Sequence, residues 1–188
     1  MRIISGSFKG KKILLPKDKL TRPLKDLTKE SIFNILKHSK LLKVELENSN
    51  ILDLFSGVGS FGLECLSRGA KNVTFLESYK KVLSVLKKNI DNLNQQNQTK
   101  VIEKDIFSEN TLKLLNDKFD IIFMDPPYKE KKLSYLLNAI TELKLLNTGG
   151  IIIIHRHKKE EDDLPEEFNL ILEKNYGISK IIFGNTLT

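Results

Sequence analysis

Short aliphatic runs alternate along most of this chain with segments whose apolar residues recur at helical spacing. The aliphatic runs, which have the length and content of buried strands, are 51–55, 73–76, 101–102, 121–124 and 151–154. The intervening segments with helical spacing are 60–68, 79–93, 108–116 and 131–145. Strand and helix alternating this often predict a parallel sheet that is covered by helices on both faces.

The N-terminal part departs from this alternation. Residues 2–16 contain two aliphatic runs separated by Gly6 and Gly10, a pattern typical of a β-hairpin. Pro23 then breaks the chain, and the apolar spacing that follows predicts a helix ending near His38. A basic hairpin and a helix are therefore expected before the alternating region.

The C-terminal part predicts a reversal of strand direction. Residues 168–176 and 178–183 have strand character and are joined at Gly177, as in an antiparallel pair. The fold class expected from the pattern as a whole is therefore α/β, with a parallel sheet closed by an antiparallel hairpin.

Length and composition are those of one globular domain. With 188 residues, of which 40% are hydrophobic and 29% charged, the chain can bury a core. We expect a single domain over 1–188, with 1–43 as a basic hairpin-and-helix extension and 44–188 as the core. The longest aliphatic run, 151–154, is far too short to span a bilayer, and no secretory signal is visible. Cys65 is the single cysteine, which fits a reducing compartment. A cytoplasmic location is therefore expected.

The positive charge of the chain is concentrated near its N-terminus. The net charge is +7, and residues 1–43 hold 12 lysines and arginines against 3 acidic residues, whereas the remainder holds 19 against 21. Such a segment suits a polyanion, because each neutralised phosphate releases condensed counterions. A solvated lysine-rich surface is the alternative explanation of the charge. The candidates for contact with phosphates are Arg2, Lys9, Lys11 and Lys12.

A glycine-rich turn follows the run 51–55 and opens the next predicted helix. Gly57, Gly59 and Gly62 allow the backbone to bend sharply and to approach a ligand closely, and the helix N-terminus offers unpaired amides. The same glycines spell the dinucleotide-binding pattern G-x-G-x-x-G. By themselves they do not separate nicotinamide cofactors from other adenosine cofactors.

Acidic residues stand at the ends of the first three predicted strands. Asp53 can hydrogen-bond or neutralise the cationic amino-acid end of a cofactor, and it would repel a pyrophosphate; a helix-capping role is the alternative. Glu77 stands where an acceptor for ribose hydroxyls belongs. Asp105 can accept a hydrogen bond from an adenine amine, with Ile106 against the ring. These residues favour an adenosine cofactor that carries positive charge.

The sharpest signal in the sequence is Asp125-Pro126-Pro127-Tyr128, directly after the run 121–124. Two prolines fix the chain direction and free backbone carbonyls from sheet pairing. An exocyclic base amine is a poor nucleophile and gains positive charge on methylation, so acceptors must hold its N–H groups. The Asp125 carboxylate and the Pro126 carbonyl can do this, and Tyr128 can stack on the base. A proline turn with a capping aspartate and a surface tyrosine is the structural alternative.

Together these residues resemble class I methyltransferases that act on amino nitrogens. The segments 2–12, 21–23 and 30–34 are similar to bacterial 16S ribosomal RNA guanine-N2 methyltransferases of the RsmD type, and the resemblance extends over 2–183. It implies a Rossmann-like, seven-stranded, mostly parallel sheet with an antiparallel last hairpin. It further implies S-adenosylmethionine as the methyl donor and a guanine of small-subunit ribosomal RNA, assembled with protein, as the acceptor.

The resemblance also assigns site residues. The residues expected at the cofactor are Thr21, Arg22, Asp53, Phe55, Ser56, Gly57, Gly59, Gly62, Glu77, Ser78, Asp105 and Ile106. Those expected at the target base are Asp125, Pro126, Pro127 and Tyr128. One departure is His155-Arg156-His157, where relatives more often have an acidic residue. With no further ligand in sight, we interpret this tripeptide as solvated or RNA-facing and expect no metal site.

Several other functions remain compatible with the sequence. An adenine-N6 methyltransferase acting on DNA or RNA, or a glutamine methyltransferase acting on a protein, would face the same chemical problem at nitrogen. The three glycines also fit a nicotinamide-dependent oxidoreductase. A ribosome-assembly protein that has kept the fold and lost turnover is a further alternative.

Overall fold

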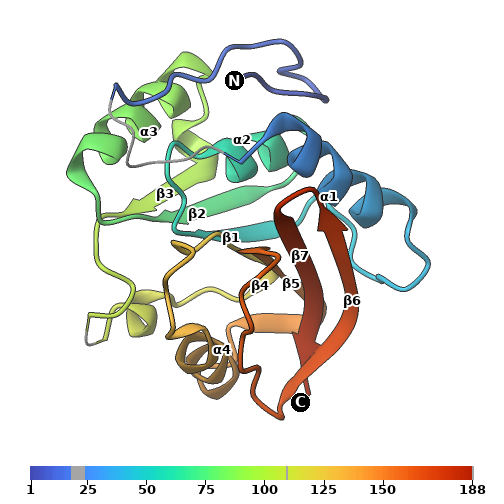
Figure 1. The fold of residues 1–188 in the computed structure, drawn as a ribbon. Coiled ribbons are helices and arrows are strands. Elements are labelled where there is room, and N and C mark those ends of the chain that lie inside the picture. Colours follow the sequence, from blue (N-terminus) through green and yellow to red (C-terminus); the bar gives the residue numbers. More distant parts are fainter. Residues whose placement is uncertain (18–23, 109, 188) are drawn as a thin grey trace.

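A seven-stranded mixed sheet forms the centre of the structure, a computed structural model that describes residues 1–17, 24–108 and 110–187. The strand order is β3-β2-β1-β4-β5-β7-β6 (Figure 1). The strands are β1 (Asn50–Leu54), β2 (Asn72–Leu76), β3 (Thr99–Ile102), β4 (Phe119–Met124), β5 (Leu146–His157), β6 (Phe168–Tyr176) and β7 (Ser179–Thr186). Neighbouring strands are parallel except where β7 pairs antiparallel with β5 and β6. The predicted Rossmann-like sheet with a reversed last hairpin is confirmed.

The aliphatic runs are uninterrupted because both faces of the sheet are buried. Ile51 of β1 pairs in register with Ile121 of β4, and both pack into the apolar cluster on one face. The next residues, Leu52 and Ile122, point to the opposite face and are buried in a second cluster. The run of apolar side chains along each strand therefore serves two cores.

Helices cover both faces of this sheet (Figure 1). The helices are α1 (Asp26–His38), α2 (Ser60–Ser67), α3 (Lys80–Asn92) and α4 (Leu133–Glu142). Phe33, Phe61 and Leu86 bring α1, α2 and α3 into one apolar cluster, whereas Leu136 brings α4 into the other. In the described ranges, no helix combines the length and the apolar character that crossing a bilayer requires.

The helix predicted at 108–116 is wrong. The described residues of that crossover form only a 3₁₀ turn, η2 (Leu112–Leu114); a second such turn, η1 (Gln96–Gln98), precedes β3. Asn110 has a φ of +63°, which a helix does not accommodate. Leu112 is nevertheless buried. The apolar spacing therefore indicated correctly which residue is buried, although the backbone there is not an α-helix.

The N-terminal segment reverses direction as a hairpin does, but its described residues pair with each other at a single antiparallel bridge, between Arg2 and Lys12. Other backbone amides of the segment bind helix α2 instead. Ile4 and Ser5 both donate to the carboxylate of Glu64, at 2.8 and 3.0 Å. Backbone bonds donated by Ile3, Gly10 and Ile13 still join the two arms of the segment, so docking on α2 engages amides that lie between them.

A buried ion pair ties this segment and α1 to the core. Lys29 Nζ lies 3.5 Å from Glu64 Oε2, and both side chains are fully buried. The same ammonium donates to the Arg2 carbonyl at 3.0 Å. Burial lowers the pKa of Lys29, although the charges of Glu64 and Asp26 act in the opposite direction. Removal of Glu64 would leave a buried cation without its main partner.

Candidate active site

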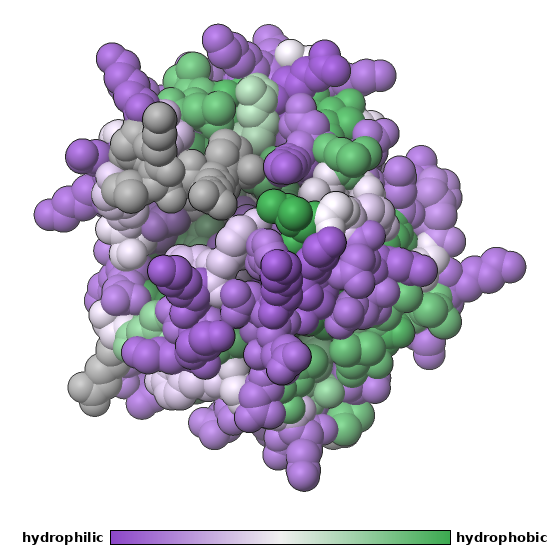
Figure 2. Space-filling model, in the orientation of Figure 1, coloured by the Kyte–Doolittle hydropathy of each residue, from purple (hydrophilic) through white to green (hydrophobic). Residues whose placement is uncertain are grey.

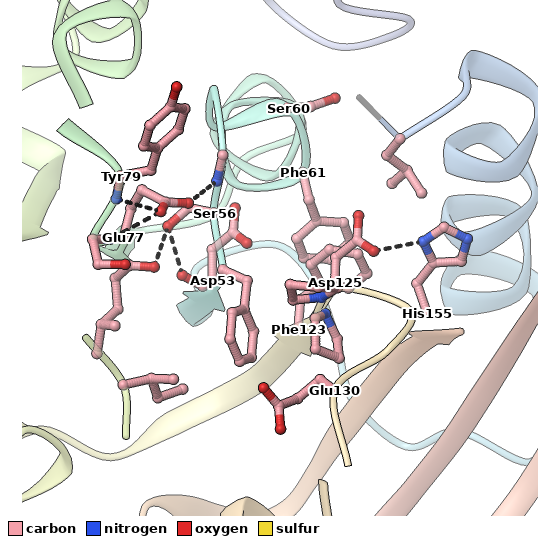
Figure 3. Close-up of a pocket in the computed structure, with 18 of the residues that line it drawn as sticks. Asp53, Ser56, Ser60, Phe61, Glu77, Tyr79, Phe123, Asp125, Glu130 and His155 are labelled. Carbon is pink, nitrogen blue, oxygen red and sulfur yellow. Dashed lines mark hydrogen bonds and ion pairs between the residues drawn. The ribbon is translucent and has the colours of Figure 1, made fainter. Parts of the chain in front are cut away.

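A cavity of about 1090 Å³ lies at the edge of the sheet where the parallel strands end. β1 has β2 on one side and β4 on the other, so the chain changes direction of winding at this point, the usual ligand position in open α/β sheets. The sequence-predicted residues that line the cavity are Asp53, Phe55, Ser56, Gly57, Glu77, Ser78, Asp105, Ile106, Asp125, Pro126, Pro127 and Tyr128. Figure 3 shows Asp53 between Glu77 on one side and Asp125 on the other.

The turn after β1 concentrates backbone conformations that residues other than glycine rarely adopt. Phe55, Gly57 and Gly59 have φ values of +58°, +55° and +81°. The Ser56 hydroxyl donates to the Leu76 carbonyl at 3.0 Å and so fastens the turn to the end of β2. A strained residue such as Phe55 beside a cavity is typical of a functional site.

Two of the three patterned glycines serve packing. Neither Gly59 nor Gly62 lines the cavity. A Cβ atom on Gly62 would lie 2.4 Å from the ring of Phe75, and one on Gly59 would lie 2.5 Å from Leu86. A side chain at Gly62 would therefore collide with β2, and one at Gly59 would collide with α3. Close packing of the helix against the strand is the usual role of the third glycine in this pattern.

Asp53 is a buried carboxylate in the cavity wall, with 1% of its surface exposed. Its Oδ2 accepts a hydrogen bond from the Gly62 amide at 3.0 Å. Burial raises the pKa of Asp53 well above its ordinary value; the bond from Gly62 opposes this, and the charges of Asp125 and Glu77 add to it. A cation bound in the cavity would stabilise the ionised form of this residue.

Glu77 fastens the glycine turn to the start of α3. Its Oε2 accepts from the Gly57 amide at 2.8 Å, while Oε1 accepts from the amides of Ser78 and Tyr79 at 2.8 and 2.9 Å (Figure 3). Carboxylate oxygens carry about four lone-pair sites in all. The predicted contact of Glu77 with a ribose therefore stays a prediction, alongside its observed role in the turn.

The loop after β3 supplies a polar group and an apolar wall. Asp105 is exposed, and its Oδ1 accepts from the Phe107 amide at 3.0 Å. Ile106 is buried, and the rings of Phe55 and Phe107 have centroids 6.0 Å apart. This part of the cavity suits a flat aromatic ring that also carries a hydrogen-bond donor.

At the other end of the cavity, Asp125 is held by a histidine. His155 Nδ1 lies 2.8 Å from Asp125 Oδ1 (Figure 3). His155 Nε2 lies 2.9 Å from Ser179 Oγ. Only 6% of the His155 surface is exposed. The interpretation of His155 as solvated or RNA-facing is therefore wrong, because its side chain joins β5 to the loop after β4 and to β7.

Arg156 holds the same loop from below the cavity surface. Its guanidinium donates to the carbonyls of Pro127 and Glu130, at 3.2 and 2.9 Å, and from Nε to Asp162 Oδ1 at 2.8 Å. Arg156 is fully buried, so its interpretation as a solvated residue is also wrong. The Pro127 carbonyl is thus occupied within the protein, and the Pro126 carbonyl is the one our prediction assigns to a substrate.

Aromatic rings shape this end of the cavity. The ring of Tyr128 meets those of His155 and His157 edge-on, with centroids 6.2 and 5.3 Å apart. Phe61 and Phe123 stack with centroids 4.0 Å apart in the cavity wall. The partly exposed His157 is the one residue of its tripeptide that still fits a surface role.

The remaining predicted residues lie elsewhere. Thr21 and Arg22 fall outside the described residues. The cationic residues Arg2, Lys9, Lys11 and Lys12 are exposed and do not line the cavity. The Phe8 amide donates to Ser67 Oγ, so the tip of the N-terminal loop lies at the end of α2 that is remote from the glycine turn. Figure 2 shows hydrophilic side chains over most of the visible face, with hydrophobic atoms in patches between them.

Sequence reasoning missed the residues that hold the loop after β4, above all His155, Arg156 and Ser179. The sequence did contain a signal for His155, because Asp125 and His155 each directly follow a run predicted as a parallel strand. In the structure Met124 pairs with Ile154, so the two residues that follow them come side by side. The polar, charged and aromatic lining residues that it missed further include Lys25, Tyr79, Lys104, Phe107, Lys129 and Glu130.

Known proteins match this chain along nearly its whole length. The family model described as conserved hypothetical protein 95 matches residues 1–185. A Haemophilus influenzae protein named ribosomal RNA small subunit methyltransferase D is 32% identical over 183 residues, covering 95% of this chain and 90% of that protein. A Buchnera aphidicola protein of the same name is 36% identical over 176 residues, covering 92% and 86%. A solved Haemophilus influenzae structure, assigned only provisionally as a methylase, has a TM-score of 0.76 and 31% identity, covering 100% of this chain and 99% of its own.

Proposed function

The chain belongs to the conserved hypothetical protein 95 family, and from this premise we propose that it transfers a methyl group from S-adenosylmethionine to the exocyclic N2 amine of a guanine in 16S ribosomal RNA. Relatives named ribosomal RNA small subunit methyltransferase D support the reaction and the class of substrate. The observation that carries the proposal is that Asp53 and Asp125 line one cavity. A charged adenosine cofactor and a base amine can therefore be held within reach of each other.

The residues at the ends of β1, β2 and β3 fit S-adenosylmethionine, which supplies a methyl group on a cationic sulfur when it is bound. The raised pKa of Asp53 suits a cationic ligand, because positive charge nearby returns a buried carboxylate to its ionised form. Glu77 would accept hydrogen bonds from ribose hydroxyls, and Asp105 from the adenine amine, with Ile106 against the ring. Thr21 and Arg22 are proposed to border the same pocket.

The loop after β4 would hold the target base. The Asp125 carboxylate and the Pro126 carbonyl would accept hydrogen bonds from the amine and orient its nitrogen for attack. Positive charge develops on that nitrogen as the new bond forms, and the carboxylate stabilises it. Tyr128 would stack on the base once it has left its helix.

The substrate proposed is ribosomal RNA within an assembled or partly assembled small subunit. The exposed cations Arg2, Lys9, Lys11 and Lys12 would contact phosphates away from the cavity, which suits a substrate much larger than one nucleotide. Ribosomal RNA is a cytoplasmic substrate in bacteria, so the same proposal implies a cytoplasmic location. Because Lys29 of the extension pairs with Glu64 of the core, we also infer that 1–188 acts as one domain.

Methyl transfer to isolated ribosomal particles tests the proposal. Small subunits and naked 16S RNA from cells lacking this protein would be incubated with the purified chain and methyl-labelled S-adenosylmethionine, and the modified nucleotide mapped. We expect label at one guanine, with N2-methylguanosine after digestion. Label on adenine would mean that the target is the N6 amine of an adenine and not the N2 amine of a guanine. Binding of NAD instead of S-adenosylmethionine would overturn the proposal altogether.

A further inference from the structure

We propose that His155 is a positioning residue for methyl transfer. One nitrogen of its ring fixes the carboxylate of Asp125, and its other ring nitrogen is held by Ser179. This inference rests on the proposed function and deepens it. It starts from a side chain for which the sequence pattern predicted no role at the site. The contacts come from three strands, since Asp125 follows β4, His155 lies in β5 and Ser179 begins β7.

The two hydrogen bonds define both the orientation and the tautomer of the imidazole. An ionised carboxylate can only accept, so His155 Nδ1, 2.8 Å from Asp125 Oδ1, must carry the proton. In the neutral ring Nε2 then accepts from the Ser179 hydroxyl, 2.9 Å away. A histidine held at both nitrogens has one arrangement in place of several.

This arrangement divides the two oxygens of Asp125 between the protein and the substrate. Oδ1 is engaged by His155, which leaves Oδ2 for the amine of the base. Both residues line the cavity, but the Asp125 side chain keeps 22% of its surface exposed and the His155 side chain only 8%. His155 therefore acts through Asp125. Without it the carboxylate could rotate, and displacement of an acceptor by about 1 Å can cost up to roughly 100-fold in rate.

The charge of the ring also matters for the acceptor. The groups that face His155 are Asp125 and Tyr128 from the loop after β4, and Ser179 from β7. On β5, the neighbouring Arg156 directs its charge to Asp162, and Lys180 of β7 also lies near Asp162, at 3.6 Å. A proton added to His155 would thus place new positive charge directly beside Asp125. The neutral ring instead leaves the negative charge of Asp125 available to the cationic nitrogen of the substrate.

Substitutions at His155 separate a positioning role from a structural one. His155→Phe keeps a flat ring but removes both hydrogen bonds, and we expect kcat to fall by roughly 10- to 100-fold with KM for RNA and the Kd for S-adenosylmethionine changed by less than about threefold. His155→Asn can still donate from its amide near the position of Nδ1. It should recover most of the rate. His38→Asn, at an exposed histidine of α1, is the matched control.

A double-mutant cycle with Asp125→Ala, which removes the acceptor of the His155 bond, completes the test. If His155 acts through Asp125, His155→Phe should change kcat by less than about threefold in the Asp125→Ala background. Effects that multiply, or a wild-type rate in His155→Phe, would overturn the inference. If His155→Phe fails to fold, Ser179→Ala serves instead, with an expected fall in kcat of roughly threefold to tenfold; an unchanged rate there would overturn it equally.

The outcomes also distinguish this inference from the proposed function. Absence of methyl transfer by the wild-type chain would overturn the proposed function and this inference with it. Normal transfer by the wild type together with normal transfer by His155→Phe would overturn this inference alone.

Discussion

The two halves of the cavity are built by different kinds of contact. In the half formed at the ends of β1, β2 and β3, which we call the cofactor half, most bonds to the carboxylates come from backbone amides close in sequence. Asp53 accepts from Gly62 and Glu77 from Ser78 and Tyr79, and the bond from Gly57 to Glu77 is the longer-range one, across 20 positions. In the half formed at the ends of β4, β5 and β7, the substrate half, side chains bridge separate strands. His155 reaches a residue 30 positions away and another 24 positions away. The cofactor half is a local motif, whereas the substrate half exists only after the sheet has assembled.

This difference predicts that the substrate half can be damaged while the cofactor half survives, and Arg156→Ala is the most severe test. Arg156 and Asp162 form a buried ion pair, and removing Arg156 leaves Asp162 with the more distant Lys180, at 3.6 Å, as its charge partner. We expect a loss of about 3 kcal/mol or more in the free energy of unfolding. We also expect a loss of turnover, because the guanidinium no longer donates to the carbonyls of Pro127 and Glu130 and so no longer ties this loop to β5. Urea denaturation measures the first effect and methyl transfer the second.

The control for this substitution is Lys131→Ala. Lys131 lies 3.1 Å from Glu160 but keeps 74% of its side chain exposed, so its ion pair should contribute less than about 1 kcal/mol. Protection of Arg156→Ala by S-adenosylmethionine against urea would show that the cofactor half still forms. Equal losses from the two substitutions would contradict the distinction between the halves.

The next largest effect is expected at Asp125. Asp125→Ala removes the acceptor for the amine but touches none of the contacts that hold the glycine turn. Turnover should fall by about two orders of magnitude or more, with the Kd for S-adenosylmethionine within a few-fold of the wild type. Single-turnover kinetics and calorimetry measure the two quantities. If cofactor binding were lost to the same degree as turnover, Asp125 would belong to both halves and its assigned role would be wrong.

Asp53 offers the converse experiment. Asp53→Asn removes a charge from the cofactor half, and affinity for S-adenosylmethionine should fall by about tenfold or more while the melting temperature of the unliganded protein rises. The rise follows from the raised pKa of Asp53: the folded state binds this proton more tightly than the unfolded chain, so stability falls as pH rises from near 3.8 through the raised pKa. Above the raised pKa the ionised carboxylate therefore costs stability that asparagine would not.

The raised pKa of Asp53 also determines whether cofactor affinity rises or falls with pH. A cationic cofactor favours ionised Asp53, so affinity should increase as pH rises through the raised pKa, and binding below it should release a proton. Calorimetry in buffers of different ionisation enthalpy measures that proton directly. A wild-type affinity that is as insensitive to pH as that of Asp53→Asn would rule out this role.

How far the sequence could predict the molecule follows the same division. The strands, the α2 turn and the carboxylates at the strand ends are encoded by residues within a few positions of one another, so pattern alone located them. The role of Arg156 depends on Asp162 and on two backbone carbonyls of the loop after β4. A local sequence pattern does not predict contacts between separate segments of the chain. The false helix at 108–116 has a related cause, since apolar spacing reports burial and Asn110 with its positive φ decides the backbone.

The smallest effect is expected outside the cavity, at the N-terminal cations. Replacing Lys9, Lys11 and Lys12 together by glutamine should weaken binding to small subunits by roughly fivefold, because each lysine that neutralises a phosphate releases condensed counterions. The plot of log K against log salt should flatten by about 2, while single-turnover rates at saturating substrate stay within about twofold.

A matched triple variant separates this surface from charge in general. Lys113, Lys118 and Lys144 are equally exposed, and Lys118 and Lys144 precede β4 and β5, at the edge of the sheet opposite the cavity. Their replacement by glutamine changes the net charge by the same amount, so the salt slope should keep its wild-type value if RNA contacts the N-terminal segment. Equal flattening in both variants would mean that net charge alone governs the affinity. Because Lys9 lies near the end of α2 remote from the glycine turn, a flatter slope with unchanged chemistry would indicate that the substrate is recognised at a distance from the base it presents to Asp125.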